Sequence, residues 1–292
     1  MMIRPTIRRV KRSAAYRTKR NASLVSRLIT SPLRSLPDFL VIGAQRGGTT
    51  SFYNYLVQHS GVVPAFEKEV HFFDGDYDRG TLWYRGRFPT EAYKRRAERA
   101  GDPKIVTGEA TPYYLFHPLA PARARLVVPR AKLIVLLRNP VERAYSHYHL
   151  ERRYGLEDLS FEEAIEREPE RLAGEEEKML ADKSYRSFEH RHHSYLSRGI
   201  YMDQLQRWRN FFSEEQFLAL SSEDFYANPP AVIAQASDFL GLLAMELGEY
   251  KKHNEGRYPK VDATTRERLV DYFRPHNERL YEYLGRDLGW DR

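Results

Sequence analysis

Residues 39–56, FLVIGAQRGGTTSFYNYL, constrain the fold more than any other stretch of the sequence. A short apolar run leads into a turn of glycine and hydroxyl residues, which a helical pattern of apolar residues follows. This order is typical of a phosphate-binding loop, in which a strand of a parallel sheet leads into a helix N-terminus. In a loop that binds ATP or GTP, lysine would follow the second glycine, but here Thr49 follows Gly48 and the basic residue is Arg46. The loop therefore predicts an anion site made of backbone amides, a helix N-terminus and a guanidinium group, with no requirement for a metal ion.

Local conformation in this loop follows from its residue types. Gly47 and Gly48 are expected to adopt positive φ angles and to leave their backbone amides accessible. Thr49, Thr50 or Ser51 is expected to cap the helix that follows. The alternative is an ordinary glycine-rich turn, but an arginine and several hydroxyls gather here at the position where α/β sheets bind ligands.

The rest of the chain predicts an α/β fold. Short apolar runs that fit buried strands occur at 39–44, 104–110, 132–138 and 216–222. Amphipathic stretches between and after them predict helices near 50–59, 119–128, 140–153, 160–172, 200–212, 229–241, 262–273 and 275–284. Strands that alternate with helices favour a P-loop-like three-layer sandwich, with a mainly parallel central sheet and helices on both faces.

The N-terminus and the rest of the chain differ in net charge. The net charge is +7, but residues 1–37 hold ten Arg or Lys and no acid, so the remaining 37 basic and 40 acidic residues sum to −3. We expect residues 1–36 to be a basic, disordered tail and residues 37–292 to form one domain. The tail is compatible with contact to an anionic membrane surface, with a transit peptide or with a nucleic-acid-binding arm.

Two further features bear on the compartment. The chain contains no cysteine, which excludes disulfides and thiol chemistry. It has neither the apolar core of a signal peptide nor the ~20 apolar residues of a membrane-spanning helix. We therefore expect a cytoplasmic protein, with peripheral contact at the inner membrane face as an alternative.

A second motif, KLIVLLRNPVERAYSHYH, covers residues 132–149. P-loop NTPases often place a Mg²⁺-binding aspartate at the end of such a strand, whereas Arg138 here favours an anion. Asn139 is expected to cap a helix whose buried stripe consists of Val141, Ala144, Tyr145 and Tyr148. Ser146 lies about 150° from that stripe, so it is expected to face away from the core. Alternatively, Arg138 joins an internal ion pair and Ser146 is plain surface. Together the two motifs predict a nucleotide with phosphates at both ends of its ribose.

Three further segments belong with these two motifs, namely KEVHFFD (68–74), GEATPYYLFHP (108–118) and NEGRYPKVDATT at the start of residues 254–290. Together they resemble the sulfotransferases that use 3′-phosphoadenylyl sulfate (PAPS). The resemblance covers roughly residues 37–290. It is strongest to bacterial members and to the branch that modifies heparan sulfate at N and 3-O positions. It implies transfer of a sulfuryl group to an acceptor hydroxyl or amine, with release of 3′,5′-ADP.

The resemblance also implies roles for individual residues. Those expected to bind the 5′-phosphosulfate are Arg46, Gly47, Gly48, Thr49, Thr50 and Ser51, and Arg46 is expected to stabilise the leaving group. Arg138 and Ser146 are expected to hold the 3′-phosphate, while Gly256, Arg257 and Tyr258 close over the nucleotide. Glu69 aligns with the catalytic base. If its segment is extended, His71 shares its face and Lys68 points the other way, while Asp74 holds His71 or the acceptor.

Three departures from the family pattern concern charge. Arg46 replaces the usual loop lysine and cannot donate a proton. Glu255 replaces a lysine that often precedes Gly-Arg in the late motif. Ala110 replaces a lysine that meets the polyanionic acceptor in 3-O-type members, which argues against a heparan-like acceptor.

The acceptor is expected to be a sugar hydroxyl on a glycan, a glycolipid or a small glycosylated molecule, and no specific nucleic acid is expected. His190, His192 and His193, with Arg191 and Arg198, are expected to form a solvated or acceptor-facing basic patch and not a metal site. Two other functions remain open. One is a P-loop kinase or NTPase, which the loop and Arg138 disfavour. The other is a non-catalytic protein that binds a nucleotide or a polyanion.

Overall fold

The computed structural model describes residues 24–99, 104–244 and 258–291. Its centre is a parallel sheet of five strands in the order β2-β3-β1-β4-β5. The strands are β1 (Phe39–Gly43), β2 (Val62–Pro64), β3 (Val106–Ala110), β4 (Lys132–Leu137) and β5 (Phe217–Ser221). All four predicted strands are confirmed. The sequence missed β2, whose three residues pair only with β3 at the edge of the sheet.

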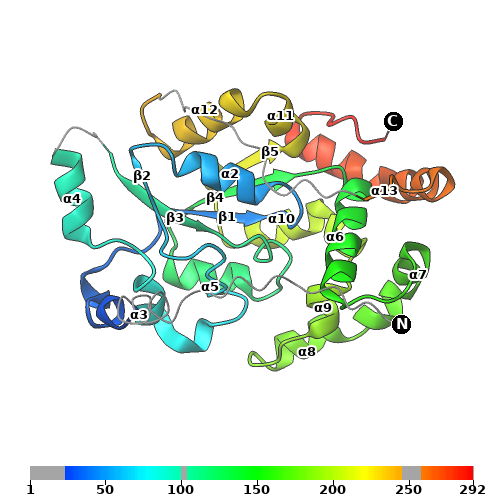
Figure 1. Ribbon diagram of the computed structural model, residues 1–292, viewed down its shortest axis with the longest axis horizontal. Coiled ribbons are helices and arrows are strands. Elements are labelled where there is room, and N and C mark those ends of the chain that lie inside the picture. Colours follow the sequence, from blue (N-terminus) through cyan, green and yellow to red (C-terminus); the bar gives the residue numbers. More distant parts are fainter. Residues whose placement is uncertain (1–23, 100–103, 245–257, 292) are drawn as a thin grey trace, which may run out of the picture.

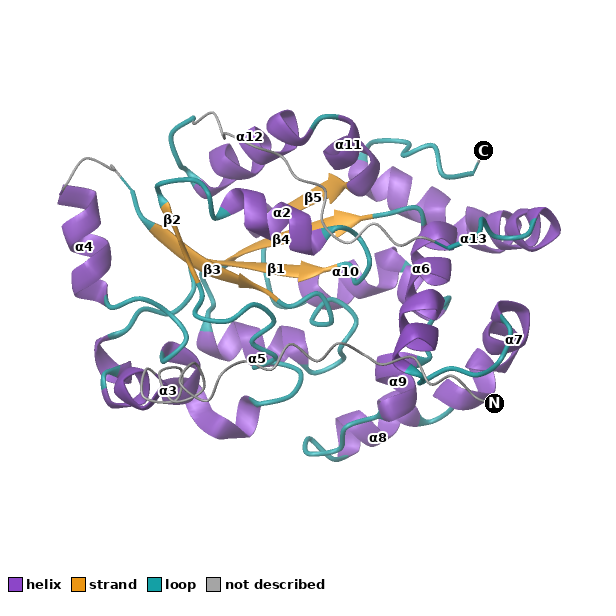
Figure 2. Ribbon diagram, in the orientation of Figure 1, coloured by secondary structure: helices purple, strands orange, loops and turns teal. Residues whose placement is uncertain are grey.

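Helices cover both faces of the sheet, which confirms the three-layer α/β sandwich (Figures 1 and 2). Side chains alternate along β1, so that Phe39 and Val41 face one layer while Leu40 and Ile42 face the other. The first layer contains α2 (Thr49–Leu56), α11 (Ser222–Ala227) and α12 (Pro229–Leu240), and the second contains α5 (Ala120–Val127) and α10 (Tyr201–Arg209). The fully buried Trp208 of α10 belongs to this second layer.

A third apolar cluster lies beyond the carboxyl ends of the strands, where the arrowheads of β1 and β4 point toward α6 in Figure 1. It joins α6 (Pro140–Tyr154), α7 (Phe161–Leu172) and α13 (Ala263–Leu284). The predicted stripe of α6 is confirmed, because Val141, Ala144 and Tyr148 are buried there and Tyr145 packs against them. The two helices predicted around Pro275 are one continuous helix.

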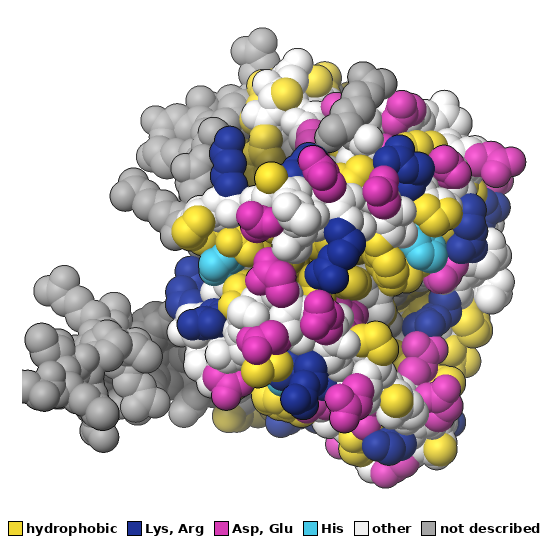
Figure 3. Space-filling model, turned by 90° about the vertical axis from the view of Figure 1, so that its right-hand side faces the viewer, with side chains coloured by type: hydrophobic (Ala, Val, Ile, Leu, Met, Phe, Trp, Pro, Cys, Tyr) yellow, Lys and Arg dark blue, Asp and Glu magenta, His cyan; other side chains and the backbone are white. Residues whose placement is uncertain are grey.

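Several short helices escaped prediction. They are α3 (Gly80–Arg85), α4 (Glu91–Arg99), α8 (Glu175–Ala181) and α9 (Phe188–His192), as well as α11. None of them is longer than nine residues, and α4 buries no side chain at all. Such helices have too few buried apolar residues to show a helical period in the sequence. Figure 3 looks onto the end of the molecule that carries α7 and α13, where acidic and basic side chains are mixed.

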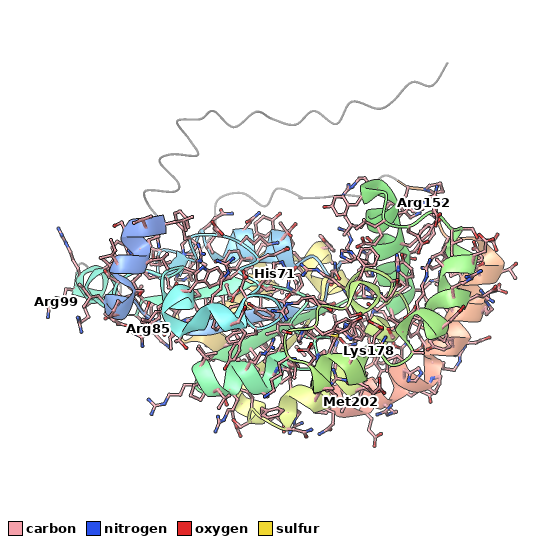
Figure 4. The ribbon with its side chains drawn as sticks, turned by 90° about the horizontal axis from the view of Figure 1, so that it is seen from below. His71, Arg85, Arg99, Arg152, Lys178 and Met202 are labelled. Atoms are coloured by element: carbon pink, nitrogen blue, oxygen red, sulfur yellow. The ribbon has the colours of Figure 1, made fainter. Side chains whose placement is uncertain are left out.

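Contacts with the domain begin before residue 37, where the sequence placed the domain boundary. The Arg34 guanidinium donates to the carbonyl oxygen of Phe88 at 2.7 Å, and the Ser35 amide donates to the carbonyl oxygen of Pro89 at 3.0 Å. Arg85 of α3, which is labelled in Figure 4, donates to the carbonyl oxygen of Arg34 at 3.0 Å. Most of the predicted tail, residues 1–23, lies outside the described residues. Within the described ranges, no helix combines the length and the apolar character needed to cross a lipid bilayer.

Candidate active site

A cavity of about 370 Å³ lies at the carboxyl ends of β1 and β4. In the strand order, β1 sits between β3 and β4, and open α/β sheets bind ligands at such a switch in strand order. The cavity brings together residues that the sequence singled out separately. Its lining includes Arg46, Gly48, Thr49, Thr50, Ser51, Glu69, His71 and Arg138.

The loop after β1 exposes a helix N-terminus to this cavity. Gly48 has a φ angle of 86° and is the N-cap residue of α2, which no side chain caps. The expected hydroxyl cap is therefore wrong, because Thr49 begins the helix itself. Gly47 is needed for close approach and not for a positive φ angle, since a Cβ atom there would lie 2.5 Å from the Leu136 carbonyl oxygen. Backbone amides at the start of α2 remain available to an anion.

Backbone strain gathers in the same place. Among the residues that the structure describes, the non-glycine residues with positive φ angles are Arg46 (70°), Glu69 (58°) and His71 (55°). Such conformations cost on the order of 1–3 kcal/mol each and occur mainly at functional sites. The segment that holds Glu69 and His71 is therefore not extended, and the side-chain directions inferred for an extended segment do not apply.

Arg46 and the 132–149 motif are in direct contact. The Arg46 Nε atom donates to Ser146 Oγ at 2.9 Å, and Arg138 donates to the Arg46 carbonyl oxygen at 3.1 Å. Burial lowers the pKa of Arg46, and repulsion from Arg138 and Arg153 adds to this effect while Tyr258 opposes it. Ser146 is fully buried against the loop and is not part of the apolar stripe of α6, so the alternative in which it is plain surface is wrong. Four arginines line the cavity, namely Arg46, Arg138, Arg153 and Arg191, and their charge favours a bound anion.

Glu69, His71 and Asp74 form a chain of polar contacts beside this loop. The His71 Nδ1 atom lies 2.7 Å from Asp74 Oδ2, and its Nε2 atom lies 3.7 Å from Glu69 Oε2. Burial lowers the pKa of His71, but the hydrogen bond to Asp74 and the nearby Glu69 carboxylate outweigh it and raise the pKa to about 9. The contact with His71 and the charge of Lys68 lower the pKa of Glu69 to about 2, against the effect of burial. At neutral pH, His71 is therefore a proton donor, and Glu69 is the group able to accept a proton.

A buried carboxylate that the sequence did not single out supports this segment. Glu109, near the end of β3, is fully buried and accepts hydrogen bonds from the hydroxyls of Tyr84 (2.7 Å), Tyr114 (3.0 Å) and Thr111 (2.6 Å). It also accepts from the backbone amide of Val70 at 3.3 Å, between Glu69 and His71. Burial raises the pKa of Glu109, although its hydroxyl donors act in the opposite direction.

Comparison with known proteins identifies the family. The family model described as "Sulfotransferase domain" matches residues 36–270. The chain belongs to the sulfotransferase family. The mouse heparan sulfate glucosamine 3-O-sulfotransferase 6 is 30% identical over 88% of this chain and 75% of its own length. The membrane-associated sulfotransferase kil1 of Dictyostelium discoideum is 29% identical over 90% of this chain and 68% of its own. A sulfotransferase crystal structure from Alicyclobacillus acidocaldarius is 30% identical, covers 88% of this chain and all of that chain, and superposes with a TM-score of 0.63.

The protein is thus a sulfotransferase enzyme, related to the branch that modifies heparan sulfate. Its cavity includes side chains that the sequence reading missed, namely Gln45, Tyr113, Glu151, Arg153, Tyr154 and Tyr226. Arg153 follows Ser146 by seven residues, or two helical turns, so the two side chains lie on the same face of α6. That spacing could have predicted Arg153 as a cavity residue. Tyr226 lies on α11, far away in sequence, and no local pattern indicated it.

The predicted basic patch of the sulfotransferase is mostly internal structure. His190 is buried, with its Nδ1 atom 2.7 Å from the Tyr113 hydroxyl, and Arg198 is buried and donates to the His190 carbonyl oxygen at 2.8 Å. His193 is buried as well, and its Nδ1 atom lies 2.5 Å from a carboxylate oxygen of Glu189. Only Arg191 and His192 of the predicted patch line the cavity. No group of His, Asp or Glu residues in the described part of the chain is arranged to hold a metal ion.

The late motif is described only in part. Tyr258 stacks on His149 of α6, with ring centroids 4.4 Å apart, and also contacts Tyr145. It therefore lies beside the helix that carries Ser146. Gly256 and Arg257 lie outside the described residues.

Proposed function

We propose that the enzyme transfers the sulfuryl group of PAPS to a hydroxyl group on a carbohydrate or glycoconjugate and releases 3′,5′-ADP. One observation carries the proposal, namely that a single cavity joins an uncapped helix N-terminus, several arginines and the Glu69–His71 pair. A volume of about 370 Å³ is within the range of nucleotide-sized ligand sites.

In this proposal the two phosphate ends of the donor bind at two neighbouring strands. The amides at the start of α2, with Thr49, Thr50 and Ser51, take the 5′-phosphosulfate. Arg138 and Ser146 take the 3′-phosphate, and Tyr258 packs from the C-terminal side. The contact between Arg46 and Ser146 supports an arrangement in which both ends of the donor are held by one network of donors.

The reaction then needs one base and fixed positive charge. As the acceptor oxygen attacks sulfur, Glu69 takes its proton, and the bond between sulfur and the 5′-phosphate oxygen breaks. Negative charge grows on that oxygen, and the amides of the loop stabilise it more in the transition state than in the ground state. His71, which Asp74 holds in its protonated form, orients Glu69 or the acceptor.

The acceptor class rests on the relatives. The mouse relative is named for a heparan sulfate glucosamine, which supports a sugar hydroxyl. Ala110, where the resemblance implies a lysine, is buried at the end of β3, and its carbonyl oxygen accepts from the Glu69 amide at 3.2 Å. A methyl group in that place supports an acceptor with less charge than heparan sulfate. We place the enzyme in the cytoplasm, and the basic composition of its N-terminal sequence suits contact with an anionic membrane surface.

Transfer of ³⁵S from labelled PAPS to components of a cell extract tests the proposal. We expect the wild type and Glu67→Gln to transfer label, and Glu69→Gln to lose transfer while it retains affinity for 3′,5′-ADP. Glu67 is a matched control because it precedes the base by only two residues but makes a different contact. Its carboxylate lies 3.9 Å from Arg87, whereas that of Glu69 lies 3.7 Å from His71. Equal transfer by both variants would show that Glu69 is not the base.

A further inference from the structure

Lys68 occupies the space between the donor loop and the base. Its Nζ atom donates to Thr50 Oγ1 at 2.7 Å and to Glu69 Oε1 at 2.8 Å. The side chain is 25% exposed, and both of its partners, Thr50 and Glu69, line the cavity. Thr50 belongs to the loop that takes the 5′-phosphosulfate, and Glu69 is the base for the acceptor. Lys68 therefore contacts both the loop assigned to the donor and the residue assigned as the base.

Arg46, by contrast, is held on the other side of the loop. Its Nε atom is bonded to Ser146 of α6, and its carbonyl oxygen accepts from Arg138. These contacts direct the guanidinium toward the residues assigned to the 3′-phosphate. Arg46 replaces a loop lysine, so the position that would otherwise supply an ammonium group to the transferring sulfur has lost it.

We propose that Lys68 is a second catalytic cation, which binds the sulfuryl oxygens of the donor during transfer. This inference rests on the proposed function. In the step itself, the acceptor oxygen forms a bond to sulfur and the bond from sulfur to the 5′-phosphate oxygen breaks. The acceptor proton goes to Glu69, and the electron pair of the broken bond stays on 3′,5′-ADP. Lys68 keeps its protons throughout and donates hydrogen bonds.

An ammonium group suits this task. It has three N–H donors on a flexible stem, so it can follow the sulfuryl oxygens as sulfur moves, whereas a guanidinium fork is planar and rigid. The same movement takes Lys68 away from Glu69. Since Lys68 contributes to the low pKa of Glu69, its engagement by the donor makes Glu69 a stronger base at the time when a base is needed.

Binding measurements without any acceptor test the assignment. PAPS carries the sulfuryl group and 3′,5′-ADP lacks it, so a residue that binds this group distinguishes the two. We expect Lys68→Met to weaken PAPS binding by about tenfold or more, as the loss of a charged hydrogen bond does, and to change 3′,5′-ADP binding by less than about twofold. Lys68→Arg should recover part of the difference. Lys178→Met, at a lysine of α8 that is 58% exposed and paired with Glu175, should change neither affinity.

A double variant separates direct contact from screening of Glu69. In a Glu69→Gln background, Lys68→Met should still weaken PAPS binding selectively. If the selective loss disappears there, Lys68 acts only by neutralising Glu69, and the proposal is wrong. An equal loss of both nucleotides, or no loss, would also overturn it. If the wild type binds neither nucleotide, the donor assignment fails, and the role of Lys68 fails with it.

Discussion

Glu109 offers a sharp test of how the segment that holds Glu69 and His71 is fixed. Its two oxygens accept four hydrogen bonds, three from hydroxyls and one from a backbone amide, so the arrangement suits a carboxylate. In Glu109→Gln, an NH₂ group replaces one oxygen and points at existing donors. The hydroxyls of Tyr84, Tyr114 and Thr111 can rotate, but the Val70 amide cannot.

The size of the effect follows from those contacts. Hydrogen bonds to a charged acceptor contribute about 1.5–3 kcal/mol each, and a buried donor left without a partner costs about 1–3 kcal/mol. The variant no longer has to bury a charge, which saves several kcal/mol of desolvation free energy. This gain offsets part of the free energy lost with the hydrogen bonds. We expect Glu109→Gln to lower the free energy of unfolding by about 2–4 kcal/mol. Turnover should fall as well, because the amide of Val70 fixes the backbone between Glu69 and His71.

Urea denaturation followed by circular dichroism measures the change in the unfolding free energy. The control is Glu166→Gln, since the Glu166 side chain is 64% exposed and pairs with Arg268 at 3.4 Å. The control should stay within about 0.5 kcal/mol of the wild type. A Glu109→Gln variant as stable as that control would refute the view that a charged Glu109 anchors the segment.

Three further predictions concern the site. The folded-state pKa of His71, about 9, lies above its ordinary 6.5, so its stabilisation is complete below pH 6.5 and is lost as pH rises to 9. The greater stability of the wild type over His71→Asn should shrink across that window, and a constant difference would contradict the pairing with Asp74. Arg138→Ala should weaken binding of 3′,5′-ADP by about 10–100-fold in calorimetric titration and that of 5′-AMP far less; equal losses would remove Arg138 from the 3′-phosphate. Gly47→Ala should abolish donor binding, because its Cβ atom meets backbone, whereas Gly285→Ala should bind normally, since a Cβ atom there meets nothing within 4 Å and the strain of its φ angle of 63° lies away from the cavity. Normal binding by Gly47→Ala would show that the close approach is not needed.

Much of the fold was predictable because its long apolar runs follow the periods of strands and helices. The runs at β1, β3, β4 and β5 each proved to be a strand, and the stripe of α6 is buried as expected. Elements without such a period were missed. The strand β2 is three residues long, and α4 lies on the surface as a charged helix.

The site was predictable where chemistry is local and not where it depends on backbone strain or distant contacts. Glycines, hydroxyls and Arg46 mark the loop in the sequence itself. The positive φ angle of Glu69 has no sequence signal, and the enrichment of histidine in that region is too weak to indicate the conformation of His71. For this reason we expected the side chain of Lys68 to point away from Glu69, whereas its Nζ atom donates a hydrogen bond to the Glu69 carboxylate. Glu109 also went unnoticed, since its partners come from α3, from the Glu69–His71 segment and from residues that follow β3.

The central claim is that arginines and main-chain amides hold an adenosine with phosphates on both the 3′ and 5′ positions. Thermal unfolding with 3′,5′-ADP or ATP, each in Mg²⁺ and in EDTA, tests it most directly. At a nucleotide concentration of about 100 times Kd, 3′,5′-ADP should add about 2.7 kcal/mol to the unfolding free energy and raise Tm by several degrees. The account predicts that this shift persists in EDTA and exceeds the shift with ATP. A shift that is selective for ATP and disappears on chelation would contradict it.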